Sequence, residues 1–150
     1  MAYTSPQRHS EVVPASLKDL RALKLLADRH KLELGFVLAP ALQEGITNGQ
    51  VYIIKRSSQV LAFVHFRHRR DAVTKIYQIC VDCSAQRKGL GMAMLEAVRK
   101  DALQRGQVEI TLMCPTDLLA NGFYKRMGFS LLQTISGKRR ALNIWNLKLR

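Results

Sequence analysis

Acidic residues and cysteines are scarce in this chain of 150 residues. Only 11 Asp and Glu stand against 24 Lys and Arg, which leaves a formal net charge of +13 at pH 7. The excess favours an anionic partner, such as nucleic acid or a polyphosphorylated molecule, although a solvated basic surface fits it as well. Three cysteines are too few for a disulfide framework, and an odd number cannot all pair. This indicates a reducing compartment.

Long apolar runs are also missing from the sequence. No segment approaches the roughly 18 apolar residues that a membrane helix needs. Residues 1–14 contain Arg8, His9 and Glu11 where a signal peptide would have its apolar core. We therefore expect a cytoplasmic protein with no membrane contact.

The chain has no internal repeat and no linker rich in Pro, Gly or Ser. We therefore expect one domain over residues 1–150, with a flexible tail at 1–9. Apolar periodicity and turn residues predict helices over 16–30, 40–47, 91–106 and 115–127. They predict strands over 10–13, 51–55, 60–67, 73–82, 108–113, 129–135 and 141–149.

The middle of this order is a strand, a glycine turn, a helix and a strand. Such a βαβ unit makes its two strands parallel. Hairpins are predicted on both sides of it, so the fold class is α+β. We expect a mixed, mostly antiparallel, twisted sheet of six to seven strands with about four helices.

The turn that joins the predicted strand 73–82 to the next helix has the composition of an anion site. Its residues are Gln86, Arg87, Lys88, Gly89, Leu90, Gly91 and Met92. The first N–H groups of a helix lack internal partners, and glycines let a phosphate approach the backbone. The two glycines could instead serve only tight packing. The pattern matches neither a Walker loop nor the three-glycine dinucleotide fingerprint, which argues against nucleotide hydrolysis and hydride transfer.

Two segments of the sequence are similar to the motifs of a known family. Ile79-Cys80-Val81-Asp82 followed by Gln86-x-x-Gly89-x-Gly91 resembles the strand-four motif of the GNAT superfamily, the GCN-five-related N-acetyltransferases. Phe123-Tyr124-x-x-x-Gly128-Phe129 resembles the C-terminal signature of that family. The resemblance covers residues 51–149 and is strongest over 77–129.

This resemblance implies a fold, a cosubstrate and a reaction. In the family the fourth and fifth strands splay apart, and the pantetheine arm of acetyl-CoA pairs with the fourth strand. By position that backbone belongs to Ile79, Cys80 and Val81. An N–H near Ile79 or Cys80 would stabilise the oxyanion, and the turn Gln86 to Met92 would hold the pyrophosphate. Acetyl-CoA is then the acyl donor, no metal is needed, and a primary amine attacks the thioester directly.

Tyr124 lies where the family commonly has the tyrosine that protonates the departing CoA thiolate. A phenol can do this because its usual pKa is near 10. The alternative is a packed aromatic with no chemical role. Asp117 stands where many relatives have an asparagine that contacts the cofactor, and we expect it to cap the helix instead, with Asn121 as the alternative donor to the cofactor.

The sequence leaves the general base and the acceptor open. Gln78 occupies a position where several relatives have Glu, and Gln cannot take a proton. Glu33, Glu109 and an ordered water remain candidates. The acceptor, a small molecule or a protein amine, should bind near residues 32–38. A non-catalytic module that binds CoA or nucleic acid is the alternative function, and a homodimer is left open.

Three further features have plain structural interpretations. Cys80 and Cys83 have a Cys-x-x-Cys spacing, but too few ligands accompany them for zinc, so we expect buried thiols. His65 and His68 should join neighbouring arginines in a solvated cluster. Such a cluster could attract an acidic acceptor or a phosphate backbone. Nucleic acid is nevertheless not favoured as a partner. Trp145 should pack in the core.

Overall fold

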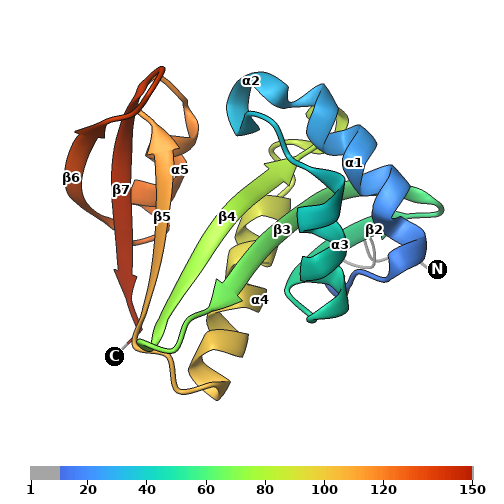
Figure 1. Ribbon diagram of the computed structural model, residues 1–150, viewed down its shortest axis with the longest axis horizontal. Helices are drawn as coiled ribbons and strands as arrows, with labels where there is room; N and C mark the ends of the chain where they lie inside the picture. The colour runs from blue at the N-terminus through green and yellow to red at the C-terminus, as the bar shows by residue number, and fades with distance from the viewer. Residues whose placement is uncertain (1–10, 150) are drawn as a thin grey trace, which may run out of the picture. The chain divides into compact units, whose positions relative to one another are not determined.

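The computed structural model describes residues 11–149 (Figure 1). Its α-helices are α1 (Leu20–Arg29), α2 (Lys31–Leu34), α3 (Ala39–Thr47), α4 (Leu90–Gln104) and α5 (Ala120–Arg126). Its strands are β1 (Val13–Pro14), β2 (Val51–Arg56), β3 (Gln59–His68), β4 (Val73–Val81), β5 (Glu109–Pro115), β6 (Ser130–Ser136) and β7 (Ala141–Lys148). Short 3₁₀ helices cover Leu17–Asp19 and Cys83–Ala85. The predicted tail at 1–9 lies outside the described residues.

The seven strands form one mixed sheet in the order β1-β2-β3-β4-β5-β7-β6. β4 and β5 are parallel, while β1 with β2, β2 with β3, and β7 with both β5 and β6 are antiparallel. The parallel ladder joins Val73–Ile76 to residues 109–112, and both strands continue beyond it. This confirms the predicted α+β class and its central βαβ unit. The described residues hold one helix more than the four expected, because α2 lies in a segment predicted as a loop.

The chain divides into two compact units. Unit 1 comprises the described residues up to 65 together with 78–97, and unit 2 comprises 66–77 and 98–149. In unit 1, α1 and α3 lie on one face of β2 and β3, and the N-terminal half of α4 lies on the other (Figure 1). Leu23, Leu26, Ile53, Phe63 and Met94 are fully buried in this unit. Burial of these apolar side chains is the main force that holds the helices on the sheet.

The capping box expected from the sequence is confirmed, and it lies on the 3₁₀ turn Leu17–Asp19 that leads into α1. The Ser16 N–H donates to Asp19 Oδ2 at 2.9 Å, and Asp19 also accepts a hydrogen bond from Lys55 on β2 at 3.1 Å. A 3₁₀ turn precedes α1, which ends at Arg29. The cap therefore fixes both the start of the helix and its attachment to the sheet.

The last predicted helix is shorter than expected. β5 continues to Pro115, which pairs with Leu142, so α5 begins only at Ala120. The expectation that Asp117 caps the helix is wrong. The N-cap residue is Leu119, and the Asp117 carboxylate accepts a hydrogen bond from Arg140 at 2.8 Å. A partner that lies 23 residues further along the chain could not be inferred from local spacing.

The predicted cluster of solvated histidines is also wrong. His65 is buried, and its Nδ1 lies 3.2 Å from Gln78 Oε1. Burial lowers the pKa of His65 below its usual value. His68 is held between Thr74 Oγ1 and Asp101 Oδ2, each at 2.7 Å. Both rings therefore serve packing.

Gly45 on α3 packs against the His65 ring, and this packing can be tested by substitution. A Cβ at Gly45 would lie 2.6 Å from His65 Nε2, whereas a Cβ at Gly122 on α5 would lie 3.3 Å from the flexible end of Arg126. Both glycines are helical, so alanine adds the same helix propensity at each. We expect Gly45→Ala to be less stable than Gly122→Ala by about 1–3 kcal/mol, the usual cost of overpacking. Urea denaturation of the two variants measures this difference, and equal stabilities would contradict the packing described.

Candidate active site

The turn after β4 is attached to the end of that strand. The Gln86 side chain donates from Nε2 to the Val81 carbonyl at 3.1 Å. The Asp82 N–H donates to the Leu61 carbonyl of β3 at 2.8 Å. These two hydrogen bonds attach the turn to the sheet of unit 1, and the Gln86 side chain makes one of them.

The backbone of this turn contains two left-handed residues, as anion-binding turns often do. Arg87 and Gly89 have positive φ angles of 65° and 79°, and alternation of such conformations turns successive N–H groups toward one point. The first bond within α4 runs from the Ala93 N–H to the Gly89 carbonyl at 3.0 Å. The amides of residues 90–92 precede that bond, so the helix itself supplies them with no acceptor.

Charge and exposure in the turn agree with this geometry. Arg87, Lys88 and Gly89 are exposed, and the start of a helix of 15 residues adds the positive end of its dipole. A Cβ at Gly89 would meet no atom within 4 Å, so the glycine is required by its φ angle. The alternative that this glycine serves tight packing therefore loses its support.

A cluster of ionisable side chains lies beside the end of β4 in unit 1. Asp82 Oδ2 accepts from Ser84 Oγ at 2.5 Å, and its Oδ1 accepts from Arg29 at 3.3 Å. These hydrogen bonds, with Ser84 the stronger, hold the pKa of Asp82 below its usual value although burial opposes them. His30, at the C-terminal end of α1, has its Nε2 3.8 Å from the same Oδ1. Local sequence gives no signal for His30, because Asp82 meets it only in the folded chain.

The cysteines differ from the expectation that all three are buried. Cys80 and Cys114 are buried, whereas Cys83 is exposed, because it opens the 3₁₀ turn after β4. Burial raises the pKa of Cys80 to about 12, and the negative charge of Glu33 is the next largest cause. Burial likewise raises the pKa of Cys114 to about 11. Both thiols therefore keep their protons at neutral pH.

Tyr124 belongs to unit 2, on α5. It is 6% exposed, and its ring packs edge-on against Phe129 at 5.8 Å between centroids. Burial raises the pKa of Tyr124 above its usual range, with a smaller contribution from Cys114. The phenol therefore remains protonated at physiological pH, but the higher pKa also makes it a weaker acid toward a departing thiolate.

Asn121, one turn before Tyr124, is engaged in hydrogen bonds on both sides of its amide. Its Nδ2 donates to the carbonyls of Pro115 and Leu118 at 2.8 Å each. Its Oδ1 accepts from Trp145 Nε1 at 2.9 Å and from Asn143 at 3.1 Å. Asn121 thus links α5 to β5 and β7, and its role as a cofactor donor stays a prediction. Trp145 is buried, as expected.

Glu109, one of the candidate bases, lies at the start of β5. It pairs across the ladder with Val73, the first residue of β4, whereas the candidate cofactor backbone 79–81 ends that strand. Its carboxylate accepts a hydrogen bond from Asn146 of β7. This position gives Glu109 a structural role in unit 2.

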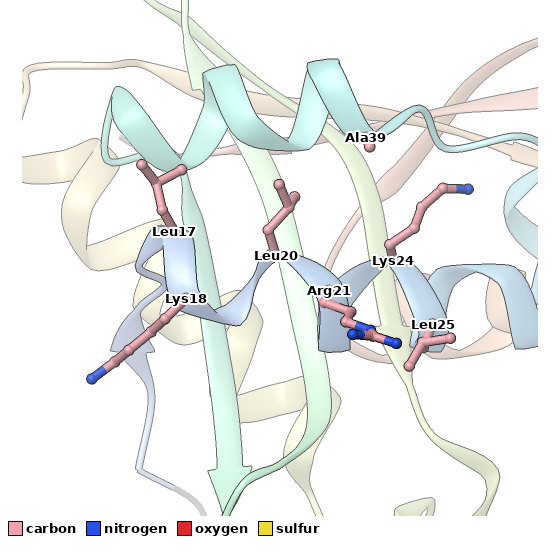
Figure 2. Close-up of a pocket in the computed structure, with 7 residues that line it drawn as sticks. All are labelled: Leu17, Lys18, Leu20, Arg21, Lys24, Leu25 and Ala39. Carbon is pink, nitrogen blue, oxygen red and sulfur yellow. The ribbon is translucent and has the colours of Figure 1, made fainter.

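A surface hollow of about 450 Å³ lies elsewhere in unit 1, along α1 and α3 (Figure 2). Leu17, Leu20 and Leu25 form its apolar lining, and the chains of Lys18, Arg21 and Lys24 surround it. None of these residues belongs to the turn or to the end of β4. The hollow is therefore separate from the site that the sequence predicts.

Comparison with known proteins supplies a family and a fold. The model of the acetyltransferase (GNAT) domain matches residues 47–131, more than half of the chain. No curated protein matches the chain in sequence. Within the described residues, no helix has the length and apolar character needed to cross a membrane.

Solved structures resemble the chain over nearly its whole length. Ard1 from Thermoplasma volcanium superposes with a TM-score of 0.83 at 17% identity, covering 92% of this chain and 96% of that one. The ribosomal-protein-S18-alanine N-acetyltransferase from Escherichia coli gives 0.77 at 18% identity, with 93% of each chain covered. PaiA N-acetyltransferase from Thermoplasma acidophilum, in complex with coenzyme A, gives 0.79 at 17%, covering 92% and 98%. At such identities the likeness shows a common fold.

Proposed function

Because the chain belongs to the GNAT acetyltransferase family, we propose that it transfers the acetyl group of acetyl-CoA to a primary amine by direct attack in a ternary complex. The observation that supports this most is the bend 86–92, where amides that receive no acceptor from their own helix and two cations follow the end of β4. A diphosphate matches that combination of donors and charge. We also propose that both units form one acyltransferase domain, since the family match takes residues from each.

The proposed binding mode follows β4 into the turn. The pantetheine arm pairs with the backbone of Ile79, Cys80 and Val81 as an added strand. The pyrophosphate binds the amides at Leu90, Gly91 and Met92, with Arg87 and Lys88 beside it. An N–H at Ile79 or Cys80 then stabilises the oxyanion that forms at the thioester carbonyl.

The thiols favour direct transfer over an acetyl-enzyme intermediate. A covalent route through cysteine requires a thiolate, because the thiol itself is a poor nucleophile. With the pKa of Cys80 near 12 and that of Cys114 near 11, each is almost wholly protonated at neutral pH. These two thiols are therefore poor nucleophiles, and we propose that the amine itself attacks acetyl-CoA while Tyr124 protonates the departing thiolate.

The acceptor that we propose carries its amine next to an apolar group. Three large apolar side chains after α1 are exposed: Leu32 at 84%, Phe36 at 72% and Leu38 at 64%. Such side chains close together in one segment commonly contact a ligand. The net charge of +13 works against a polycationic acceptor. A peptide N-terminus with an apolar first residue fits both features.

A CoA-binding module without catalysis is the second candidate, favoured by Gln78 at the position of the family's glutamate. Calorimetry with acetyl-CoA followed by a thiol-release assay over a panel of amines separates the two. We expect acetyl-CoA to bind and thiol release to depend on the acceptor, with apolar peptide N-termini preferred over polyamines. Tight binding with no acceptor-dependent release would favour the binding module instead.

A further inference from the structure

Glu33 is paired with a buried histidine at the surface of unit 1. Its Oε2 lies 2.9 Å from His30 Nδ1, one turn earlier in the chain. The Glu33 side chain is 47% exposed, whereas that of His30 is only 7% exposed. A half-exposed carboxylate is thus anchored by a ring that the protein interior holds in place.

The other side of the His30 ring faces the segment that follows β4. Its Nε2 lies 3.8 Å from Asp82 Oδ1 and 3.9 Å from Cys83 Sγ. Asp82 is in turn held by Ser84 and by the N–H bond to β3. His30 therefore ties Glu33 to the end of the strand that we propose binds the thioester arm.

The electrostatics of Cys80 agree with this placement. Among the charged groups acting on Cys80, the Glu33 carboxylate has the largest effect on the pKa of its thiol. His30, the C-cap residue of α1, pairs with Glu33 directly. The charges of Glu33, Asp82, Cys83 and Arg29 all act on the Cys80 thiol.

From this geometry we propose that Glu33 is the general base of the acetyl transfer and that His30 is the residue that positions it. The inference rests on the proposed function. As the amine nitrogen bonds to the acetyl carbonyl carbon, its proton passes to the Glu33 carboxylate. The carbon–sulfur bond then breaks, and the CoA thiolate takes a proton from Tyr124. No oxidant, metal or covalent enzyme intermediate is needed.

The other candidates lack one requirement each. Gln78 has no basic atom, and Glu109 lies at the opposite end of the parallel ladder. His65 turns one ring nitrogen to Gln78 and the other to Gly45, so neither nitrogen is available to an amine. Glu33 is the candidate that is basic, accessible and near the proposed thioester site.

Replacement of the base tests the proposal. We expect Glu33→Gln to lower kcat/KM for the amine by about 10²- to 10⁴-fold, the usual contribution of general base catalysis. The acetyl-CoA affinity should remain that of the wild type, because the bend 86–92 is untouched. Asp28→Asn is the matched control: it removes the same charge from an exposed carboxylate on α1, bonded only to Lys24 among the described residues, and should keep full activity.

Variants of His30 test whether the ring positions Glu33 or only supports the fold. Asn can donate from the place of the Nδ1 atom, whereas Ala cannot, so His30→Asn should recover most of the activity that His30→Ala loses.

The outcomes distinguish this inference from the function on which it rests. An active wild type with an equally active Glu33→Gln variant would overturn the role of Glu33 and leave the acetyltransferase intact. Equal losses in His30→Asn and His30→Ala, with Glu33→Gln impaired, would overturn the positioning role. A wild type that shows no acceptor-dependent thiol release would overturn both proposals together.

Discussion

The Tyr124→Phe variant is expected to bind acetyl-CoA as the wild type does and to turn over about 10²- to 10⁴-fold more slowly, because general acid catalysis contributes that much. The phenol is protonated across the physiological range, and burial raises its pKa further. Removal of one oxygen from a buried ring preserves its volume and its contacts with Phe129. The loss should therefore fall on kcat.

Tyr52→Phe on β2 is the matched control for this result, since it removes the same atom from a residue of unit 1 with no proposed role in the reaction. Its kcat should stay near that of the wild type, because no step of the proposed reaction involves Tyr52. Steady-state kinetics with saturating acetyl-CoA give the comparison. Full turnover by Tyr124→Phe would remove the tyrosine from the mechanism and leave a packed aromatic.

Charge reversal in the turn should move cofactor affinity and stability in different directions. In Lys88→Glu a carboxylate replaces the exposed ammonium just before α4 begins. An acidic group near a helix N-terminus is favourable to the helix, so stability should be unchanged or slightly higher. The same carboxylate repels a diphosphate, and we expect the acetyl-CoA affinity to fall about 10²-fold, which corresponds to about 2.8 kcal/mol.

The control is Lys100→Glu, which reverses an exposed charge later on α4, away from its N-terminus. It changes the net charge of the protein by the same amount but should leave the affinity within about twofold at physiological ionic strength, because distant exposed charges are screened. Calorimetry at two salt concentrations measures both variants. Equal losses in the two would mean that the affinity reflects overall charge and that the turn is not the phosphate site.

Local patterns predicted most of the fold. The strands of the first hairpin, the capping box at Ser16 and the glycine turn before α4 follow from short-range periodicity and turn chemistry, which one segment of sequence contains. The order strand, glycine turn, helix and strand then predicted that β4 and β5 are parallel, which they are. The family match over 47–131 agrees with the two motifs that suggested it.

Features that depend on distant partners could not be predicted in this way. Asp117 pairs with Arg140 instead of capping α5, and His65 turns inward to Gln78 because β3 buries it. The pairing of His30 with Glu33 is local, but its importance depends on Asp82, which lies 52 residues after His30 and meets it only in the folded chain. A sequence shows which residues can ionise, and the fold decides which of them meet.

A crystal structure of the acetyl-CoA complex tests the central claim most directly. The account predicts diphosphate oxygens at hydrogen-bond distance, about 2.7–3.2 Å, from the backbone nitrogens of Leu90, Gly91 or Met92. It also predicts the pantetheine amides paired with the backbone at 79–81. Acetyl-CoA bound elsewhere, with side chains packed into the bend, would contradict the phosphate site and the acetyltransferase built upon it.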